Sequence, residues 1–198
     1  MYNLFATPVE KVQIVPTEEQ YEKTVVLLDK MFNDVKENNW ALETGKSTGE
    51  LGLDLHDCPE MWWLVDQAIE HIRLYWKALG YRHTDAIIPE SSWANIHSVN
   101  QTTGEHAHCG GFKKAHISSV YYIKKPPRSG HIEFVDPLEY IHRMTPVHEF
   151  SERTGTYNEF ATEQYDLILF PSWLKHRTQA NKSNEDRIAI SINFIGSW

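Results

Sequence analysis

The chain has 198 residues, with a hydrophobic fraction of 41% and a charged fraction of 23%, which is typical of one globular domain with a sizeable core. Its formal net charge of −8 argues against nucleic acid as a ligand, because phosphate binding requires a basic face. No apolar run reaches the length of a membrane span, and two cysteines, Cys58 and Cys109, are too few for a disulfide framework. We therefore expect a cytoplasmic protein with reduced thiols and no membrane partner.

The first half of the chain carries helical patterns. Thr17 and Gln20 have the spacing of a capping box, which predicts a helix from about 18 to 37 after an extended N-terminal segment. A second helix is predicted from Asp57 to Leu79, with a strongly apolar side. Between these helices, residues 38–57 are interpreted as a polar connection.

After Tyr81 the pattern changes to short apolar runs bounded by turn residues, which is typical of strands. Helices followed by strands predict two helices packed outside an antiparallel sandwich or barrel. Segment 138–165 shows no clear pattern and is predicted to be a binding loop or lid. The predicted strands are 91–99, 117–124, 131–135, 166–170 and 187–195.

The last predicted strand alternates between two kinds of side chain. One face carries isoleucines and Phe194, which predicts packing against the helices. The other face carries a guanidinium, a hydroxyl and an amide separated by a small residue, which indicates a pocket wall that could bind a carboxylate. The alternative is a solvent-facing edge strand with a surface arginine. The polar face consists of Arg187, Ala189, Ser191 and Asn193.

Three histidines are candidate metal ligands. His106 and His108 are two residues apart, so an extended segment presents both imidazoles on one face, as a metal site requires. His176 follows the apolar run that ends at Pro171, and is therefore expected at a strand–turn edge. The chain contains 11 histidines, so chance pairs occur, and a satisfied surface or core histidine is the alternative for each one. Cys109 points away from such a site and is interpreted as a small buried or half-buried thiol.

The order of these residues resembles the Fe(II)- and 2-oxoglutarate-dependent oxygenases. The similarity is greatest to their prolyl-hydroxylase-like branch and to a group of oxygenases from phages and bacteria. That branch has an H-x-D motif, a strand with two adjacent tyrosines, a distal histidine and an R-x-A-x-T or R-x-S motif. The matching positions here are His106-Ala107-His108, Tyr121-Tyr122, His176 and Arg187-Ile188-Ala189-Ile190-Ser191.

The resemblance implies a mainly β fold, a double-stranded β-helix or jelly roll, with two N-terminal helices outside the major sheet. It implies one oxygenase domain, in which residues 1–90 support a core formed by 91–198. It also implies that the three histidines bind Fe(II), and that 2-oxoglutarate chelates the iron while its far carboxylate meets Arg187, Tyr122 and Ser191. With O2, 2-oxoglutarate would be decarboxylated to succinate while a substrate is hydroxylated. Asn95, Asn193 and Trp173 are the candidates for substrate contact.

His108 departs from the usual motif, which has an aspartate or glutamate at this position. A neutral three-histidine set lacks the carboxylate charge, which is expected to weaken Fe(II) binding and to change its redox properties. The phage and bacterial group commonly has H-x-H here, so the resemblance is compatible with an active enzyme.

Two other classes of protein are also compatible with the sequence. A cupin with three histidine ligands, acting as a dioxygenase or isomerase without 2-oxoglutarate, would explain the histidines but would leave Arg187 without a purpose. A non-catalytic jelly-roll binding protein is the third interpretation. The primary substrate is expected to be a small molecule or a peptidyl side chain. The sequence leaves its identity open, and also leaves open the oligomeric state, a homodimer included.

Overall fold

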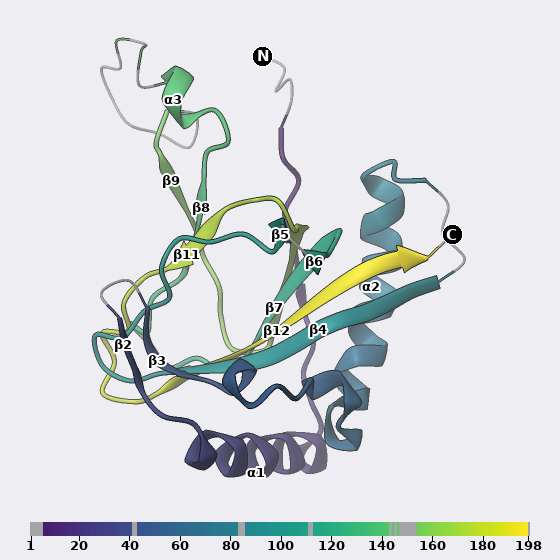
Figure 1. Ribbon diagram of the computed structural model, residues 1–198, viewed down its shortest axis with the longest axis vertical. Helices are drawn as coiled ribbons and strands as arrows, with labels where there is room; N and C mark the ends of the chain where they lie inside the picture. Colours follow the sequence, from purple (N-terminus) through teal and green to yellow (C-terminus); the bar gives the residue numbers. More distant parts are fainter. Residues whose placement is uncertain are drawn as a thin grey trace.

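A computed structural model describes residues 6–40, 43–82, 86–110, 113–142, 144, 146 and 154–197. Two antiparallel sheets form its centre (Figure 1). The large sheet has seven strands in the order β1-β10-β7-β12-β4-β3-β2, and the small sheet has the order β11-β8-β9. The strands of the large sheet are β1 (Glu10–Gln13), β2 (Asn38–Trp40), β3 (Glu43–Ser47), β4 (Ala86–His97), β7 (Ile117–Lys124), β10 (Asp166–Pro171) and β12 (Arg187–Ser197); those of the small sheet are β8 (Ile132–Val135), β9 (Tyr157–Phe160) and β11 (His176–Thr178).

From β4 onward the chain alternates between the two sheets. It passes from β4 to a segment that bridges β11 at His106, and then to β7 in the large sheet. It returns to the small sheet for β8 and β9, to the large sheet for β10, to the small sheet for β11 and to the large sheet for β12. This alternation is the double-stranded β-helix that the resemblance implied, so the predicted fold class is confirmed.

The helices begin and end close to their predicted positions. In α1 (Glu18–Asp34), the hydroxyl of Thr17 accepts a hydrogen bond from Gln20 N–H, and the Gln20 side chain accepts one from Thr17 N–H, so the capping box is present. The second helix, α2 (Trp62–Ala78), begins five residues later than predicted, because the short 3₁₀ helices η2 (Leu55–Asp57) and η3 (Pro59–Met61) occupy the segment before it.

The two faces of β12 contact two separate cores. One face of β12 packs with Leu28 of α1 and Ile72 of α2 in one apolar cluster, which confirms the predicted helix-facing side; it consists of Ile188, Ile190, Ile192 and Phe194. Ala189, on the other face, belongs to a second cluster between the two sheets, together with Tyr122 of β7 and Phe134 of β8. The polar face of β12 therefore lies inside the β-helix. The alternative of a solvent-facing edge strand is wrong, since β12 pairs with both β4 and β7.

Two segments differ from the sequence-based expectation. Residues 38–47, interpreted as a polar connection, form β2 and β3 at the edge of the large sheet. Within 138–165 the chain forms the short helix α3 (Glu139–His142) and β9, while residues 143, 145 and 147–153 lie outside the described part. The remaining short elements are η1 (Thr48–Leu51), β5 (Cys109–Gly110) and β6 (Lys113–Lys114).

No helix among the described residues is both long and apolar enough to cross a membrane. Cys58 and Cys109 are both free thiols, and Cys109 is exposed, so the prediction that it is buried or half-buried is wrong.

Candidate active site

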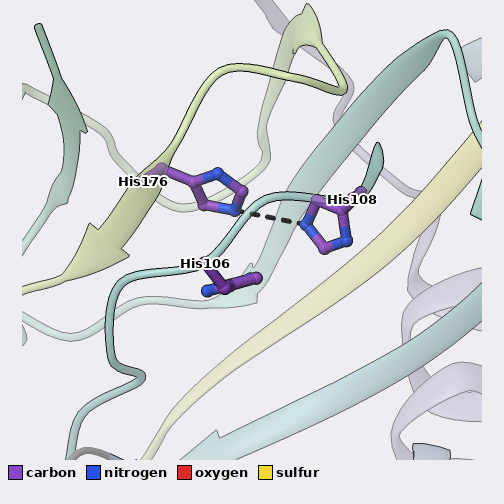
Figure 2. A group of neighbouring side chains, drawn as sticks. All are labelled: His106, His108 and His176. Carbon is purple, nitrogen blue, oxygen red and sulfur yellow. Dashed lines mark hydrogen bonds between the residues drawn. The ribbon is translucent and has the colours of Figure 1, made fainter. Parts of the chain in front are cut away.

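The three predicted metal ligands converge, with their rings close to one another (Figure 2). His106 and His108 lie on the segment between β4 and β7, and His176 is the first residue of β11. Two backbone hydrogen bonds join these segments, since His106 N–H donates to His176 O and His176 N–H donates to His106 O, each at 3.0 Å. The position of His176 relative to His106 is therefore fixed by the backbone.

The ring nitrogens are arranged as ligands of a single ion. The candidate ligand atoms of the three residues all lie within 4.8 Å of one another, and Nε2 of His108 is 3.2 Å from Nε2 of His176. Two nitrogens that each lie roughly 2.1 Å from one ion, at right angles, are about 3 Å apart. The geometry therefore fits a metal ion bound through imidazole nitrogens.

Hydrogen bonds to the backbone select the tautomer that such binding requires. Nδ1 of His106 lies 2.8 Å from the carbonyl oxygen of Gly104, and Nδ1 of His176 lies 3.0 Å from that of Leu174. A carbonyl oxygen can only accept, so Nδ1 carries the proton in both rings and the Nε2 lone pair points into the site. Burial, with a smaller effect of the neighbouring His106, lowers the pKa of His176 to about 3, so the neutral ligand form is the one present at neutral pH.

Arg187 is buried and held by the chain itself. Its Nη1 donates to the carbonyl oxygens of Ser129 at 2.5 Å and Gln179 at 3.0 Å, and its Nη2 donates to the Thr178 hydroxyl at 3.0 Å. Three of the five guanidinium N–H groups are thus used by protein partners. Nε is buried and has no hydrogen-bond partner among the described residues. The Nε–H group of Arg187 therefore remains available to donate a hydrogen bond to a ligand.

Tyr122 provides a second buried donor beside Arg187. Its hydroxyl is completely buried, and although the Thr162 side chain is close enough to lower its pKa, it makes no hydrogen bond of ordinary geometry with the described residues. Burial raises the pKa of Tyr122, while the positive charge of Arg187 opposes the shift, so the phenol remains protonated at neutral pH. A neutral hydroxyl next to a guanidinium fits a carboxylate, which accepts from both.

The remaining predicted residues lie in different surroundings. Ser191 is buried on the same face of β12 as Arg187, and its Cα is paired with that of Trp93. Asn193 is buried too, but its amide is hydrogen-bonded to Ser118 and Ser91 within the sheet. Trp173 is 45% exposed in the turn between β10 and β11. Asn95 lines a pocket together with His106 and His108.

A pocket of about 200 Å³ adjoins the histidines. Its walls come from β3, from β4 and from the segment that carries the H-x-H motif. None of its described lining residues is an aspartate or glutamate, and Lys46 adds a positive charge. The pocket therefore suits neutral polar or anionic groups. Its lining residues are Thr44, Gly45, Lys46, Ser47, Trp93, Asn95, His97, Thr103, His106, Ala107 and His108.

Two polar residues near Arg187 were not predicted as site residues from the sequence. His97 is opposite Arg187 in the β4–β12 register and lines the pocket. Lys125 is half-buried, with Nζ 5.7 Å from the centre of the Tyr122 ring and 3.4 Å from Nδ1 of His131. The only sequence signal for either residue is its position at the end of a strand that also carries site residues.

A second group of possible metal ligands, Asp54, His56 and Asp57, lies on η2 and just before it. Its members are partly exposed, and Ser92 already bonds two of them, through N–H to Asp54 and through its hydroxyl with His56 Nδ1. Neighbouring polar groups on the surface account for this arrangement.

Gly45 is required where β3 forms the pocket wall. Its φ is +109°, and an added Cβ would lie 2.4 Å from the carbonyl oxygen of Ile96. Gly45→Ala is therefore expected to lower the free energy of unfolding by about 2 kcal/mol or more, since the backbone conformation and the contact both oppose a side chain. Gly52→Ala is the matched control, because Gly52 has a φ of +65° but nothing within 4 Å. Urea denaturation of both variants measures the difference, and equal losses would show that the Ile96 contact is unimportant.

Comparison with solved structures defines the class of fold. A Pseudomonas putida prolyl-4-hydroxylase is similar with a TM-score of 0.64 at 9% identity, covering 97% of this chain and 94% of that one. The viral collagen prolyl hydroxylase of Paramecium bursaria Chlorella virus-1, solved with 2-oxoglutarate, has a TM-score of 0.57 at 13% identity and covers 94% of each chain. A Trichoplax adhaerens prolyl hydroxylase, solved with a peptide, has a TM-score of 0.62 at 10% identity over 95% of this chain and 83% of that one. These likenesses establish the double-stranded β-helix of 2-oxoglutarate oxygenases.

The sequence itself matches a family model over residues 91–193, slightly more than half of the chain, and the family is described as "Putative 2OG-Fe(II) oxygenase". The chain belongs to this family, and is an Fe(II)- and 2-oxoglutarate-dependent oxygenase. A search of curated proteins gives no match. Family membership sets aside both alternatives of the sequence analysis, the cupin without 2-oxoglutarate and the non-catalytic jelly roll.

Proposed function

We propose that His106, His108 and His176 bind Fe(II) through their Nε2 atoms, and that Arg187 and Tyr122 bind the distal carboxylate of 2-oxoglutarate, with Ser191 on the same wall. The convergence of three imidazoles, two of them held in the Nδ1–H tautomer by backbone carbonyls, is the observation that carries this proposal. Two buried donors without partners, Arg187 Nε and Tyr122 Oη, support the second half of it.

Fe(II), 2-oxoglutarate and O2 together supply the oxidising chemistry that hydroxylates a C–H bond and yields succinate. The protein contributes binding, orientation and exclusion of water. The backbone bridge between His106 and His176 keeps two ligands in place before a metal binds. The three protein acceptors on Arg187 hold the guanidinium at one position, so little orientation entropy is lost when a carboxylate binds.

The primary substrate that we propose is a small molecule or a peptidyl side chain, which enters the pocket lined by Asn95 and Trp93. A pocket of about 200 Å³ suits a single side chain or a small metabolite. The net charge of −8 and the polar lining favour such a ligand over nucleic acid. Among the other candidates, Trp173 is exposed at the surface and therefore accessible to a substrate. The amide of Asn193 is buried and hydrogen-bonded to Ser118, so its effect on a substrate would be indirect.

We further propose that residues 1–198 act as one oxygenase domain in the cytoplasm. The apolar cluster that joins α1 and α2 to the large sheet supports one domain, since the support and the β-helix share a core. Two free thiols fit a reducing compartment.

Succinate formation tests this function. Purified protein supplied with Fe(II), 2-oxoglutarate and O2 is expected to release succinate slowly without a substrate, and faster when a library compound is a substrate. His176→Ala is expected to abolish both rates, whereas His56→Ala, in the second histidine-containing group, is expected to change neither. Succinate release that survives His176→Ala would contradict the proposed metal site.

Co-substrate affinity is expected to fall as the pH rises above about 8. Burial and the positive charge of Arg187 lower the pKa of Lys125 to about 8, against the opposing carboxylates Asp166, Glu163 and Glu159. A bound dicarboxylate adds negative charge near Lys125 and favours its protonated form. The affinity for 2-oxoglutarate is therefore highest below pH 8, where Lys125 is protonated. It decreases by about three- to tenfold in total as Lys125 loses its proton at higher pH.

Calorimetric titration of 2-oxoglutarate between about pH 7 and pH 9 measures this decrease. Other groups facing Lys125 do not titrate in that range, since the pKa of His131 is lowered and that of Tyr122 is raised. Lys125→Met is expected to remove the decrease. Lys124→Met is the matched control, because Lys124 lies 3.7 Å from Glu185 instead. The same pH profile in both variants would show that Lys125 is not the responsible group.

A further inference from the structure

Buried polar atoms without partners gather around Arg187. In the described part of the chain, four such atoms belong to Arg187 itself or to a neighbour: Arg187 Nε, Tyr122 Oη, Ser129 Oγ and His97 Nδ1. Ser129 accepts from Arg187 through its carbonyl oxygen, and His97 is opposite Arg187 in the sheet register. An unpaired buried polar group costs about 1–3 kcal/mol, and folded proteins contain few of them. Their concentration at one point indicates a ligand that accepts several hydrogen bonds.

His97 is the member of this group that faces the metal ligands. It lines the same pocket as His106 and His108, whereas neither Arg187 nor Tyr122 is among the residues described as lining it. His97 therefore belongs both to the pocket beside the metal ligands and to the sheet position opposite Arg187.

The imidazole of His97 is fixed in its position. Its Nε2 is 2.9 Å from the Thr103 hydroxyl, and its carbonyl oxygen accepts from the Asn181 amide at 2.8 Å. Thr103 N–H donates to the Thr178 hydroxyl, which also accepts from Arg187. His97, Thr103, Thr178 and Arg187 thus form one hydrogen-bonded network. Burial and the charge of Arg187 lower the pKa of His97 to about 3, so the ring is neutral beside the guanidinium.

We propose that His97 is a co-substrate contact, whose Nδ1–H donates to the carboxylate of 2-oxoglutarate that Arg187 and Tyr122 also bind. In this tautomer the Thr103 hydroxyl donates to Nε2, so both ring nitrogens are used. The inference rests on the proposed function, and it adds a specific residue from β4 to the co-substrate site. It also gives the buried Nδ1 of His97 a hydrogen-bond partner, which it lacks among the described residues.

Two isosteric substitutions test the contact. The amide of asparagine reaches the position of Nδ1, and that of glutamine reaches the position of Nε2. With Mn(II) in place of iron, His97→Gln is expected to weaken 2-oxoglutarate binding about tenfold or more in calorimetry, because the donor at Nδ1 is lost. His97→Asn is expected to stay within about threefold of wild type. Mn(II) affinity is expected to be unchanged in both variants.

His116→Gln and His116→Asn are the controls for general effects of such substitutions. The His116 ring packs against Trp76 on the helix side of the large sheet. In wild-type protein with ¹⁵N-labelled histidine, loaded with Zn(II), addition of 2-oxoglutarate is expected to shift the Nδ1 signal of His97. The shift is measured in wild-type protein, so only the variant that is used to assign the His97 signal has to be stable.

Unchanged 2-oxoglutarate affinity in His97→Gln, or an unshifted His97 signal on binding, would overturn the inference while leaving the proposed function intact. Loss of Mn(II) affinity in both variants would overturn it too, since His97 would then act on the metal ligands. Failure of the wild-type protein to bind 2-oxoglutarate would instead contradict the proposed function.

Discussion

His108→Ala is expected to lower the affinity for Fe(II) by at least about 100-fold. Changing a group that only orients a metal ligand costs about 10- to 100-fold in affinity, and the proposed role of His108 is that of a ligand itself. Its ring lies next to that of His176, with the two Nε2 atoms 3.2 Å apart, so no other described side chain is placed to substitute for it. Anaerobic titration of Fe(II) against a competing chelator measures the loss.

His108→Asp provides the informative comparison. The carboxylate restores the charge that most members of the superfamily have at this position, so Fe(II) affinity is expected to equal or exceed that of wild type. Without metal, a buried carboxylate among neutral imidazoles is expected to lower the melting temperature. Wild-type Fe(II) affinity in His108→Ala would show that His106 and His176 suffice and that the three-histidine assignment is wrong.

Arg187→Met is expected to weaken 2-oxoglutarate binding by about 30-fold or more. Removing one partner of a buried, hydrogen-bonded charge pair costs about 2–5 kcal/mol, and a factor of ten corresponds to about 1.4 kcal/mol. Fe(II) affinity is expected to remain within about threefold of wild type, because the metal ligands are on other segments. Calorimetry measures the affinity for 2-oxoglutarate with Mn(II) as the metal, and anaerobic titration against a competing chelator measures the affinity for Fe(II).

The same substitution is expected to destabilise the fold, since three hydrogen bonds from Arg187 to Ser129, Gln179 and Thr178 are lost. Arg177→Met is the matched control, because Arg177 is on the adjacent strand β11 and pairs with Glu133 at 2.6 Å on the outer side of the small sheet. Arg187→Lys keeps the charge but not the planar fork, and is expected to give an intermediate affinity. Equal 2-oxoglutarate affinity in Arg187→Met and Arg177→Met would refute the role of the guanidinium.

The sequence predicted the parts of the fold that depend on local pattern. The alternation along β12 identified both its helix-facing side and its polar side, and the capping residue Thr17 located the start of α1. In contrast, β3 has no apolar alternation, and its pairing with β4 is a long-range contact that a local pattern cannot reveal. The late start of α2 likewise follows from two short 3₁₀ turns, one of which begins with Pro59.

The residues of the candidate site also differ in whether a local sequence pattern could reveal them. His106 and His108 could be recognised because their spacing has a meaning on an extended chain, and Arg187 because of its strand. His97 could not be separated from the other ten histidines, since only the register between β4 and β12 places it opposite Arg187. The protein partners of Arg187 include two backbone carbonyl oxygens, which every residue has, so the sequence could not show that three of its N–H groups are used.

The central claim is that one three-histidine centre binds Fe(II) and receives 2-oxoglutarate held by Arg187. Visible absorption under anaerobic conditions tests it most directly, with Fe(II) added first and 2-oxoglutarate second. A weak band is expected only after both additions, at lower 2-oxoglutarate concentration in wild type than in Arg187→Met, and not at all in His176→Ala. The absence of a band in wild-type protein at saturating 2-oxoglutarate, or its persistence in His176→Ala, would contradict the account.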